Sequence, residues 1–193
     1  MRIDELGYCD AARQVASPNC DARQPGEVIR LVVVHNISLP PGQFGGDDIE
    51  QLFTNRIDPA AAPGYDELAR LRVSAHFLIR RDGELVQFVP TAARAWHAGA
   101  SLWCGRERCN DFSVGIELEG SDFVPFEPAQ YQRLLDLLVT LAERHPIEAI
   151  VGHSEIAPGR KTDPGPFFDW SRVHAALPQL RPANPGESAT ARL

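Results

Sequence analysis

The segment from Ile29 to His35, IRLVVVH, restricts the fold more than any other part of this sequence. A continuous run of β-branched residues predicts a buried strand. Because a buried strand needs backbone partners and apolar cover, it belongs in a sheet that other elements protect. His35 stands at the carboxyl end of this strand, where a loop rich in proline and glycine begins.

A second strand is predicted over residues 112–120, FSVGIELEG. Its pattern has a period of two, so alternate side chains face opposite sides of the sheet. One side carries Val114, Ile116 and Leu118, and the other carries Gly115, Glu117 and Glu119. We therefore expect one apolar face and one face that holds carboxylates.

An amphipathic helix is predicted over residues 127–144, with Pro128 in its first turn and His145-Pro146 at its end. The other expected elements are a helix over 49–56, a hairpin of His76–Arg81 and Glu84–Val89, a strand over 148–152 and a helix from Asp169. Residues 98–111 and 153–166 are expected to be irregular. Together these elements predict a single-domain α/β sandwich with a central mixed β-sheet flanked by helices.

The length of 193 residues fits one domain, which we place at 1–180. Residues 181–193 are rich in Pro, Ala, Gly and Ser, so we expect a mobile C-terminal tail. A formal net charge of −7 argues against nucleic acid as a partner, because a phosphate backbone normally requires a basic face. Neither a secretory signal nor a membrane span is recognisable, which predicts a cytoplasmic protein with four free cysteine thiols.

Three residues are candidate metal ligands: His35 and His153, which lie where predicted strands meet loops, and Asp163, ten residues after His153 in the loop segment RKTDPGP. Imidazole nitrogen and carboxylate oxygen suit Zn²⁺, and three protein ligands leave a fourth position for water. The spacing is not a compact motif, so ordinary loop residues remain the alternative on this evidence alone.

Five segments, in order, make the sequence similar to a known family: VVVHNISLPPGQFGG, RVSAHFLIRRDGELVQFVP, AWHAG, GRERCNDFSVGIELEG and GHSEIAPGRKTDPGP. They resemble the cytosolic N-acetyl-anhydromuramyl-L-alanine amidases of peptidoglycan recycling (the AmpD type), zinc enzymes of the amidase_2 superfamily. The resemblance runs from about Ser17 to Trp170. It implies an α/β sandwich with a central mixed sheet, in agreement with the pattern above.

By this resemblance the zinc ligands are His35, His153 and Asp163, and the catalytic residues are Glu117 and Lys161. Asp at position 163, where the wider superfamily often has Cys, resembles the recycling branch. Lys161 is the only lysine beside 18 arginines. The implied chemistry is consistent: the metal activates water and polarises the carbonyl, a carboxylate moves protons, and an ammonium stabilises the oxyanion.

Four residues are predicted to contact substrate, and Asn36 is the candidate to contact its amide or sugar. Asn36 adjoins His35, and His97, like His76, could line the site or support it as a hydrogen-bonded histidine. Arg72 and Arg108 could pair with carboxylates of the peptide stem, or they could be ordinary surface arginines. For Glu119 we expect a structural or solvent-facing role.

The predicted function is a zinc-dependent hydrolase that cuts the lactyl–L-Ala amide bond of 1,6-anhydro-N-acetylmuramyl peptides in peptidoglycan recycling. The expected partner is this small-molecule substrate, with no nucleic acid, membrane or obligate protein partner. Two alternatives remain: an amidase that acts on intact peptidoglycan, and a peptidoglycan-binding module without activity. The presence of all three ligands, Glu117 and Lys161 argues against the second.

Overall fold

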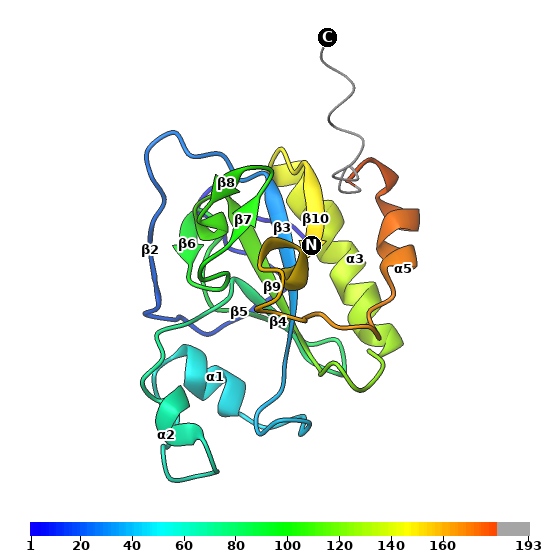
Figure 1. Ribbon diagram of the computed structural model, residues 1–193. Coiled ribbons are helices and arrows are strands. Elements are labelled where there is room, and N and C mark those ends of the chain that lie inside the picture. The colour runs from blue at the N-terminus through cyan, green and yellow to red at the C-terminus, as the bar shows by residue number, and fades with distance from the viewer. Residues whose placement is uncertain (181–193) are drawn as a thin grey trace.

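The structure of the protein is a computed structural model that describes residues 1–180. Its centre is a six-stranded mixed sheet in the order β1-β5-β4-β9-β3-β10 (Figure 1). These strands are β1 (Arg13–Gln14), β5 (Leu85–Gln87), β4 (Phe77–Ile79), β9 (Ser113–Glu119), β3 (Leu31–Ile37) and β10 (Ala149–Gly152). Adjacent strands are parallel except for the antiparallel β4–β5 pair, which is the predicted hairpin. The predicted fold class is confirmed.

The register of β3 and β9 brings a histidine and a glutamate side by side. These parallel strands pair along their length, and His35 lies directly beside Glu117. Their side chains leave the sheet on the same face because paired residues of neighbouring strands point the same way. β10 pairs with the other edge of β3 and ends at Gly152, so His153 follows immediately at the same end of the sheet.

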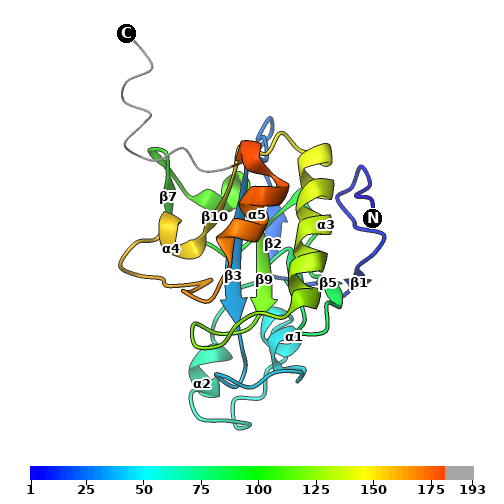
Figure 2. The ribbon, with the colours of Figure 1, turned by 90° about the vertical axis from the view of Figure 1, so that its right-hand side faces the viewer.

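One face of the sheet carries a single apolar core beneath α3 (Pro128–Arg144) and α5 (Trp170–Ala176); in Figure 2 α5 lies in front of β3 and α3 lies beside β9. It contains the predicted apolar residues of β9, namely Val114, Ile116 and Leu118, together with Leu134, Leu138 and Leu141 of α3. The helix begins where Gln130 Oε1 accepts a hydrogen bond from the backbone N–H of Glu127. Gln130 Nε2 donates to the carbonyls of Ile79 and Glu119, which fixes the helix to the sheet.

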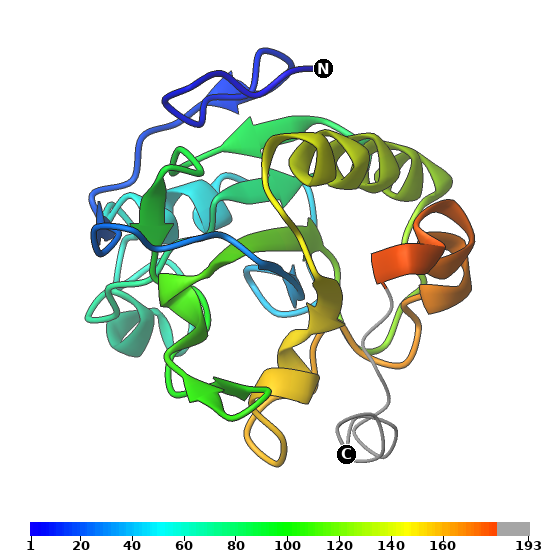
Figure 3. The ribbon, with the colours of Figure 1, turned by 90° about the horizontal axis from the view of Figure 1, so that it is seen from above.

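The opposite face carries two smaller apolar clusters. One joins α1 (Asp48–Phe53) and α2 (Tyr65–Leu68) to Leu78 and Val86 of the sheet. The other joins Leu31 and Val33 to α4 (His153–Ile156). Figure 3 shows α4 and the hairpin of β7 (Leu102–Trp103) and β8 (Arg106–Glu107) on the side of the sheet away from α3. Buried polar residues of this face form what we call the polar strip: His35, His76, Ser113, Glu117 and Glu119.

Several expectations need correction. The helix predicted over 49–56 ends at Phe53, and Asn55 takes a positive φ of 58° that a helix does not contain. The segment 153–166 is not all loop, because it begins with α4. The segment 98–111 holds β7 (Leu102–Trp103), β8 (Arg106–Glu107) and the 3₁₀ turn η1 (Cys109–Asp111). Also missed are β1, α2, β2 (Cys20–Ala22), β6 (Ala93–Ala95) and η2 (Pro178–Leu180).

Other expectations can be compared directly. All four cysteines are free thiols, as predicted. Within residues 1–180, no helix combines the length and apolar character needed to cross a membrane. The tail predicted for 181–193 lies outside the described residues, and the division of the chain at position 180 stays a prediction.

Candidate metal centre and active site

Three ligand atoms converge at the carboxyl ends of β3 and β10. His35 Nδ1, His153 Nδ1 and Asp163 Oδ2 lie 3.0 Å from one another in each pairing. Bonds of about 2.0–2.1 Å to a tetrahedral ion would separate ligand atoms by roughly 3.3 Å, which is close to this spacing. His35, His153 and Asp163 therefore form a metal-binding group, as their positions in the sequence suggested.

The hydrogen bonds of His153 show why a cation fits here. Its Nε2 lies 3.2 Å from the carbonyl oxygen of Ala98, which can only accept, so Nε2 carries the proton. In the neutral ring Nδ1 is then a bare acceptor, and it faces the carboxylate oxygen of Asp163 at 3.0 Å. Two acceptors this close repel each other unless a proton or a cation lies between them.

The electrostatics of the group also suit metal binding. Burial lowers the pKa of His35 to about 4, although the neighbouring carboxylate of Asp163 acts in the opposite direction. Burial acts to raise the pKa of Asp163, but the neighbouring imidazoles of His153 and His35 outweigh this and hold the pKa below its usual range. At neutral pH His35 is thus uncharged and Asp163 ionised, the states in which these residues bind metals.

Glu117 projects from β9 beside His35, within the polar strip. Its side-chain oxygen Oε2 is buried and, among the described residues, has no hydrogen-bond partner. Burial raises the pKa of Glu117 well above its ordinary value, and the charge of Asp163 adds to this, while Lys161 opposes it. A carboxylate with an unused oxygen and a raised pKa has the properties of a general base.

Lys161 lies on the exposed loop between α4 and Asp163. Its positive charge acts to lower the pKa of both Glu117 and His35. Among the described residues we find no hydrogen bond or ion pair for its ammonium group. The preceding residue, Arg160, has a different role: its Nη2 donates to the carbonyls of Ala98 at 2.8 Å and Ala100 at 2.6 Å, which ties this loop to the segment that supports His153.

The predicted substrate-binding residues lie in different surroundings. Asn36 Nδ2 donates to Asp122 Oδ1 at 2.7 Å and to the carbonyl of Pro164 at 3.1 Å, so its amide ties β3 to the segment that carries Asp163. Arg72 is exposed and donates to the backbone carbonyls of Ala69 and Leu71. Arg108 is also exposed, with Nε 3.1 Å from Asp111 Oδ2. It helps to line a cavity of about 420 Å³ with Leu102, Glu107 and Ile156.

His97 contacts a metal ligand. Its Nδ1 lies 3.0 Å from His35 Nε2, and its Nε2 lies 3.1 Å from Ser113 Oγ. Both ring nitrogens therefore have protein partners. Of the two roles considered for His97, this geometry favours support of His35 over contact with substrate. His76 is also enclosed: its Nδ1 accepts from the backbone N–H of Gly115 at 3.0 Å.

Sequence reasoning missed two polar residues around this centre, Asn110 and Ser113, whereas Glu119 has the structural role expected for it. Glu119 is buried, and its carboxylate accepts from the backbone N–H groups of Gly45 and Arg81. Asn110 Oδ1 accepts from the backbone N–H groups of His97 at 3.1 Å and Ala98 at 2.8 Å. Ser113 could have been identified, because the period of two in β9 puts it on the face of Glu117. Nothing in the local sequence marks Asn110.

Comparison with known proteins decides the family. The family model for N-acetylmuramoyl-L-alanine amidase (Amidase_2) matches residues 25–166. The chain belongs to the N-acetylmuramoyl-L-alanine amidase family. This amidase is 59% identical over 175 residues to the 1,6-anhydro-N-acetylmuramyl-L-alanine amidase AmpD of Enterobacter cloacae, covering 90% of this chain and 94% of that one.

Solved structures agree with this assignment. A crystal structure of a selenomethionine derivative of AmpD matches with a TM-score of 0.89 and 57% identity, covering 91% of this amidase and 99% of that chain. The amidase AmiD from E. coli, in complex with the substrate anhydro-N-acetylmuramic acid-L-Ala-D-gamma-Glu-L-Lys, matches with a TM-score of 0.56 and 30% identity. That match covers 99% of this chain and 72% of AmiD.

Proposed function

We propose that this amidase uses Zn²⁺ to hydrolyse the amide bond between the lactyl carbonyl of 1,6-anhydro-N-acetylmuramic acid and L-Ala. The observation that carries the proposal is the convergence of His35, His153 and Asp163 beside the buried carboxylate of Glu117. Membership of the amidase family indicates the type of reaction. The ligand atoms of His35, His153 and Asp163 indicate the metal. Two imidazoles and one carboxylate are a usual catalytic zinc set.

Zn²⁺ held by these three residues would polarise the scissile carbonyl and lower the pKa of water to about 7. Glu117 then has two tasks. Its unpartnered oxygen accepts the proton of the attacking water, and the same carboxyl returns a proton to the nitrogen of L-Ala. The second transfer matters because an amine leaves readily only when it is protonated. The raised pKa of Glu117 suits both steps.

Lys161 stabilises the negative charge that develops on the carbonyl oxygen. One well-placed donor to such an oxyanion typically contributes ~10²–10³ in rate. A compact ammonium on a flexible stem can reach that oxygen from an exposed loop. With a base, a metal group and a cation assigned, the reaction needs no covalent nucleophile.

The substrate assignment rests on relatives. The Enterobacter cloacae protein is named for 1,6-anhydro-N-acetylmuramyl-L-alanine, and AmiD was solved with an anhydro-muropeptide. We extend this chemistry to the present chain, with peptidoglycan recycling in the cytoplasm as the setting. Arg108 and Arg72 are the candidates to bind the carboxylates of the stem peptide. Asn36 and His97 act nearer to the metal ligands.

The decisive experiment is mass spectrometry of the products from 1,6-anhydro-N-acetylmuramyl tripeptide, with metal analysis of the same sample. Free tripeptide and anhydro-sugar acid are expected, and a chelator should abolish both. Release from intact sacculi in preference to the soluble substrate would reject the recycling assignment. Substrate binding without any cleavage in the zinc-loaded protein would reject the enzyme assignment.

A further inference from the structure

A single segment, His97–Ala98, supports both histidine ligands of the metal centre. The ring of His97 contacts His35, and the carbonyl of Ala98 accepts from His153. The side chain of Asn110 fixes this segment by accepting from both of its backbone N–H groups. The support therefore derives from the turn η1, which contains Asn110 and lies far from the metal ligands in the sequence.

Ser113 determines which atoms donate and which accept in the hydrogen bonds of His97. Its Oγ lies 2.6 Å from the carbonyl oxygen of Cys109 and 3.1 Å from His97 Nε2. A hydroxyl has one proton and a carbonyl can only accept, so the proton of Ser113 points to Cys109. The lone pairs of Oγ then face His97, which must donate from Nε2. A neutral imidazole that donates from Nε2 has a bare Nδ1, and this atom faces His35 Nε2 at 3.0 Å.

We propose that Ser113 and His97 are positioning residues that hold His35 as the tautomer with its proton on Nε2. The hydrogen bonds run one way, from His35 to His97, from His97 to Ser113 and from Ser113 to Cys109. His35 Nδ1 is thereby left unprotonated, facing His153 and Asp163. This inference rests on the metal centre of the proposed function, but the tautomer itself exists without any metal.

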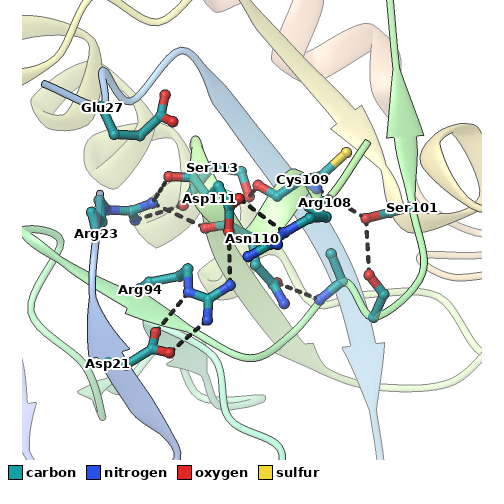
Figure 4. Close-up of polar contacts among 12 residues, drawn as sticks. Asp21, Arg23, Glu27, Arg94, Ser101, Arg108, Cys109, Asn110, Asp111 and Ser113 are labelled. Carbon is teal, nitrogen blue, oxygen red and sulfur yellow. Dashed lines mark hydrogen bonds and ion pairs between the residues drawn. The ribbon is translucent and has the colours of Figure 1, made fainter. Parts of the chain in front are cut away.

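We call this chain of hydrogen bonds from His35 to Cys109 the relay. The residues around its last acceptor, Cys109, are themselves held by hydrogen bonds. Arg23 donates from Nη1 to the carbonyls of Asn110 and Asp111, and from Nη2 to the carbonyl of Ser113 at 2.7 Å. Ser101 Oγ accepts from the backbone N–H of Cys109 at 3.1 Å. Figure 4 shows these contacts meeting around η1, so the acceptor that sets the direction is held by several independent hydrogen bonds.

Gly115 provides the space for the relay. A Cβ atom at this position would lie 2.4 Å from Cγ of His97, far inside van der Waals contact. Only glycine lets the imidazole lie against β9 between Ser113 and His35. The pattern of β9, with Ser113, Gly115 and Glu117 on one face, thus combines an acceptor, a space for a ring and a general base.

The test compares Ser113→Ala with Ser101→Ala. Both serines bond to Cys109, but only Ser113 reaches His97, so Ser101→Ala controls for disturbance of η1. In the metal-free protein, ¹⁵N chemical shifts of the His35 ring should report the Nε2–H tautomer in wild type and in Ser101→Ala, and a mixture in Ser113→Ala. The affinity for Zn²⁺, measured by competition with a chelator, should fall about 10–100-fold in Ser113→Ala only. An unchanged tautomer with unchanged affinity would overturn the proposal.

A second pair keeps the test decisive if Ser113→Ala does not fold. In His97→Gln the amide can still accept from His35 and donate to Ser113, whereas His97→Leu can do neither. We expect Zn²⁺ affinity near wild type for Gln and the larger loss for Leu. Equal affinity in the two variants would reject the relay. Failure of wild type to bind Zn²⁺ would instead reject the metal centre, while the tautomer measurement would still decide the relay.

Discussion

One face of the central sheet carries a single apolar core, whereas the other carries two apolar clusters with the polar strip between them. The same strands build both. In β9, Ile116 is fully buried in the core beneath α3, and its neighbour Glu117 is buried among polar groups on the other side. Alternation along one strand thus separates the residues that stabilise the fold from those that we propose carry out the chemistry.

The difference has an energetic side. Each buried polar group without a partner costs about 1–3 kcal/mol, and Glu117 Oε2 is such a group. Each large apolar side chain buried beneath α3 contributes about 1.5–3 kcal/mol. We expect, therefore, that changes to the unpartnered Glu117 on the polar face alter activity with little loss of stability, and that changes on the apolar face do the reverse.

The largest effect is expected for His153→Ala. Removal of one of three ligands should abolish stoichiometric zinc and with it the turnover. Metal analysis and product mass spectrometry on the same sample check this. His174→Ala, a histidine of α5 on the other side of the sheet, serves as the control. Near-normal zinc and turnover in His153→Ala would remove His153 from the metal centre.

Glu117→Gln should keep the metal but reduce kcat by about 10²–10⁴, because the amide cannot accept the proton. Glu119→Gln is the matched comparison two residues away on the same face, where the carboxylate accepts from Gly45 and Arg81. Its kcat should change far less, and its melting temperature should fall. If the two variants ranked the other way in kcat, the base would have to be reassigned.

Lys161→Ala should lower kcat by about 10²–10³ while zinc stays bound, as expected for one lost oxyanion donor. Lys161→Arg should recover only part of this loss, because the larger planar guanidinium does not replace a compact ammonium. Steady-state kinetics with zinc content measured alongside distinguish these outcomes. Near-wild-type kcat in both variants would make Lys161 an ordinary loop residue.

Leu134→Ala tests the apolar face. This side chain of α3 is fully buried, so its truncation should lower the free energy of unfolding by about 2–5 kcal/mol. We expect kcat and zinc affinity to stay at wild-type values below the melting transition. A loss of kcat comparable to that of Glu117→Gln, in protein shown to be folded, would contradict the separation of the two faces.

The smallest effect concerns pH and the metal-free protein. The pKa of Glu117 is raised in the folded state, first by burial, so above its ordinary pKa of 4.5 the unfolded chain releases this proton more readily than the native protein does. Glu117 therefore makes the folded state less stable as pH rises above that value. Chemical denaturation should find metal-free Glu117→Gln more stable than wild type at pH 7, with the difference vanishing near pH 4. A constant difference across this range would show that Glu117 is not responsible.

The parts of the fold predictable from sequence are those with a long, regular pattern. The seven residues of β3 begin with a continuous apolar run, and the seven residues of β9 and the 17 of α3 show a clear hydrophobic period. The strands β1 and β2 have two and three residues, too few to define any period. They form because partners distant in the sequence, β5 and β6, supply their hydrogen bonds.

The candidate site divides in the same way. His35 and His153 were predicted from strand ends, Asp163 from its loop, and all three from family resemblance, and their side chains do converge. Asn36 shows a neglected signal: alternation along β3 turns it away from His35, toward Asp122 and Pro164. The support by Asn110 could not be foreseen, because it depends on how η1 approaches the chain at Ala98.

The parallel pairing of β3 with β9 and β10 also determines at what stage of folding the metal centre can form. His35 and His153 are 118 residues apart in the chain, and no local turn can bring them together. High contact order of this kind slows folding, since distant segments must meet before their contacts stabilise anything. We therefore expect a metal to bind only the finished sheet and to stabilise it by mass action, so that chelation accelerates unfolding and leaves the refolding rate nearly unchanged.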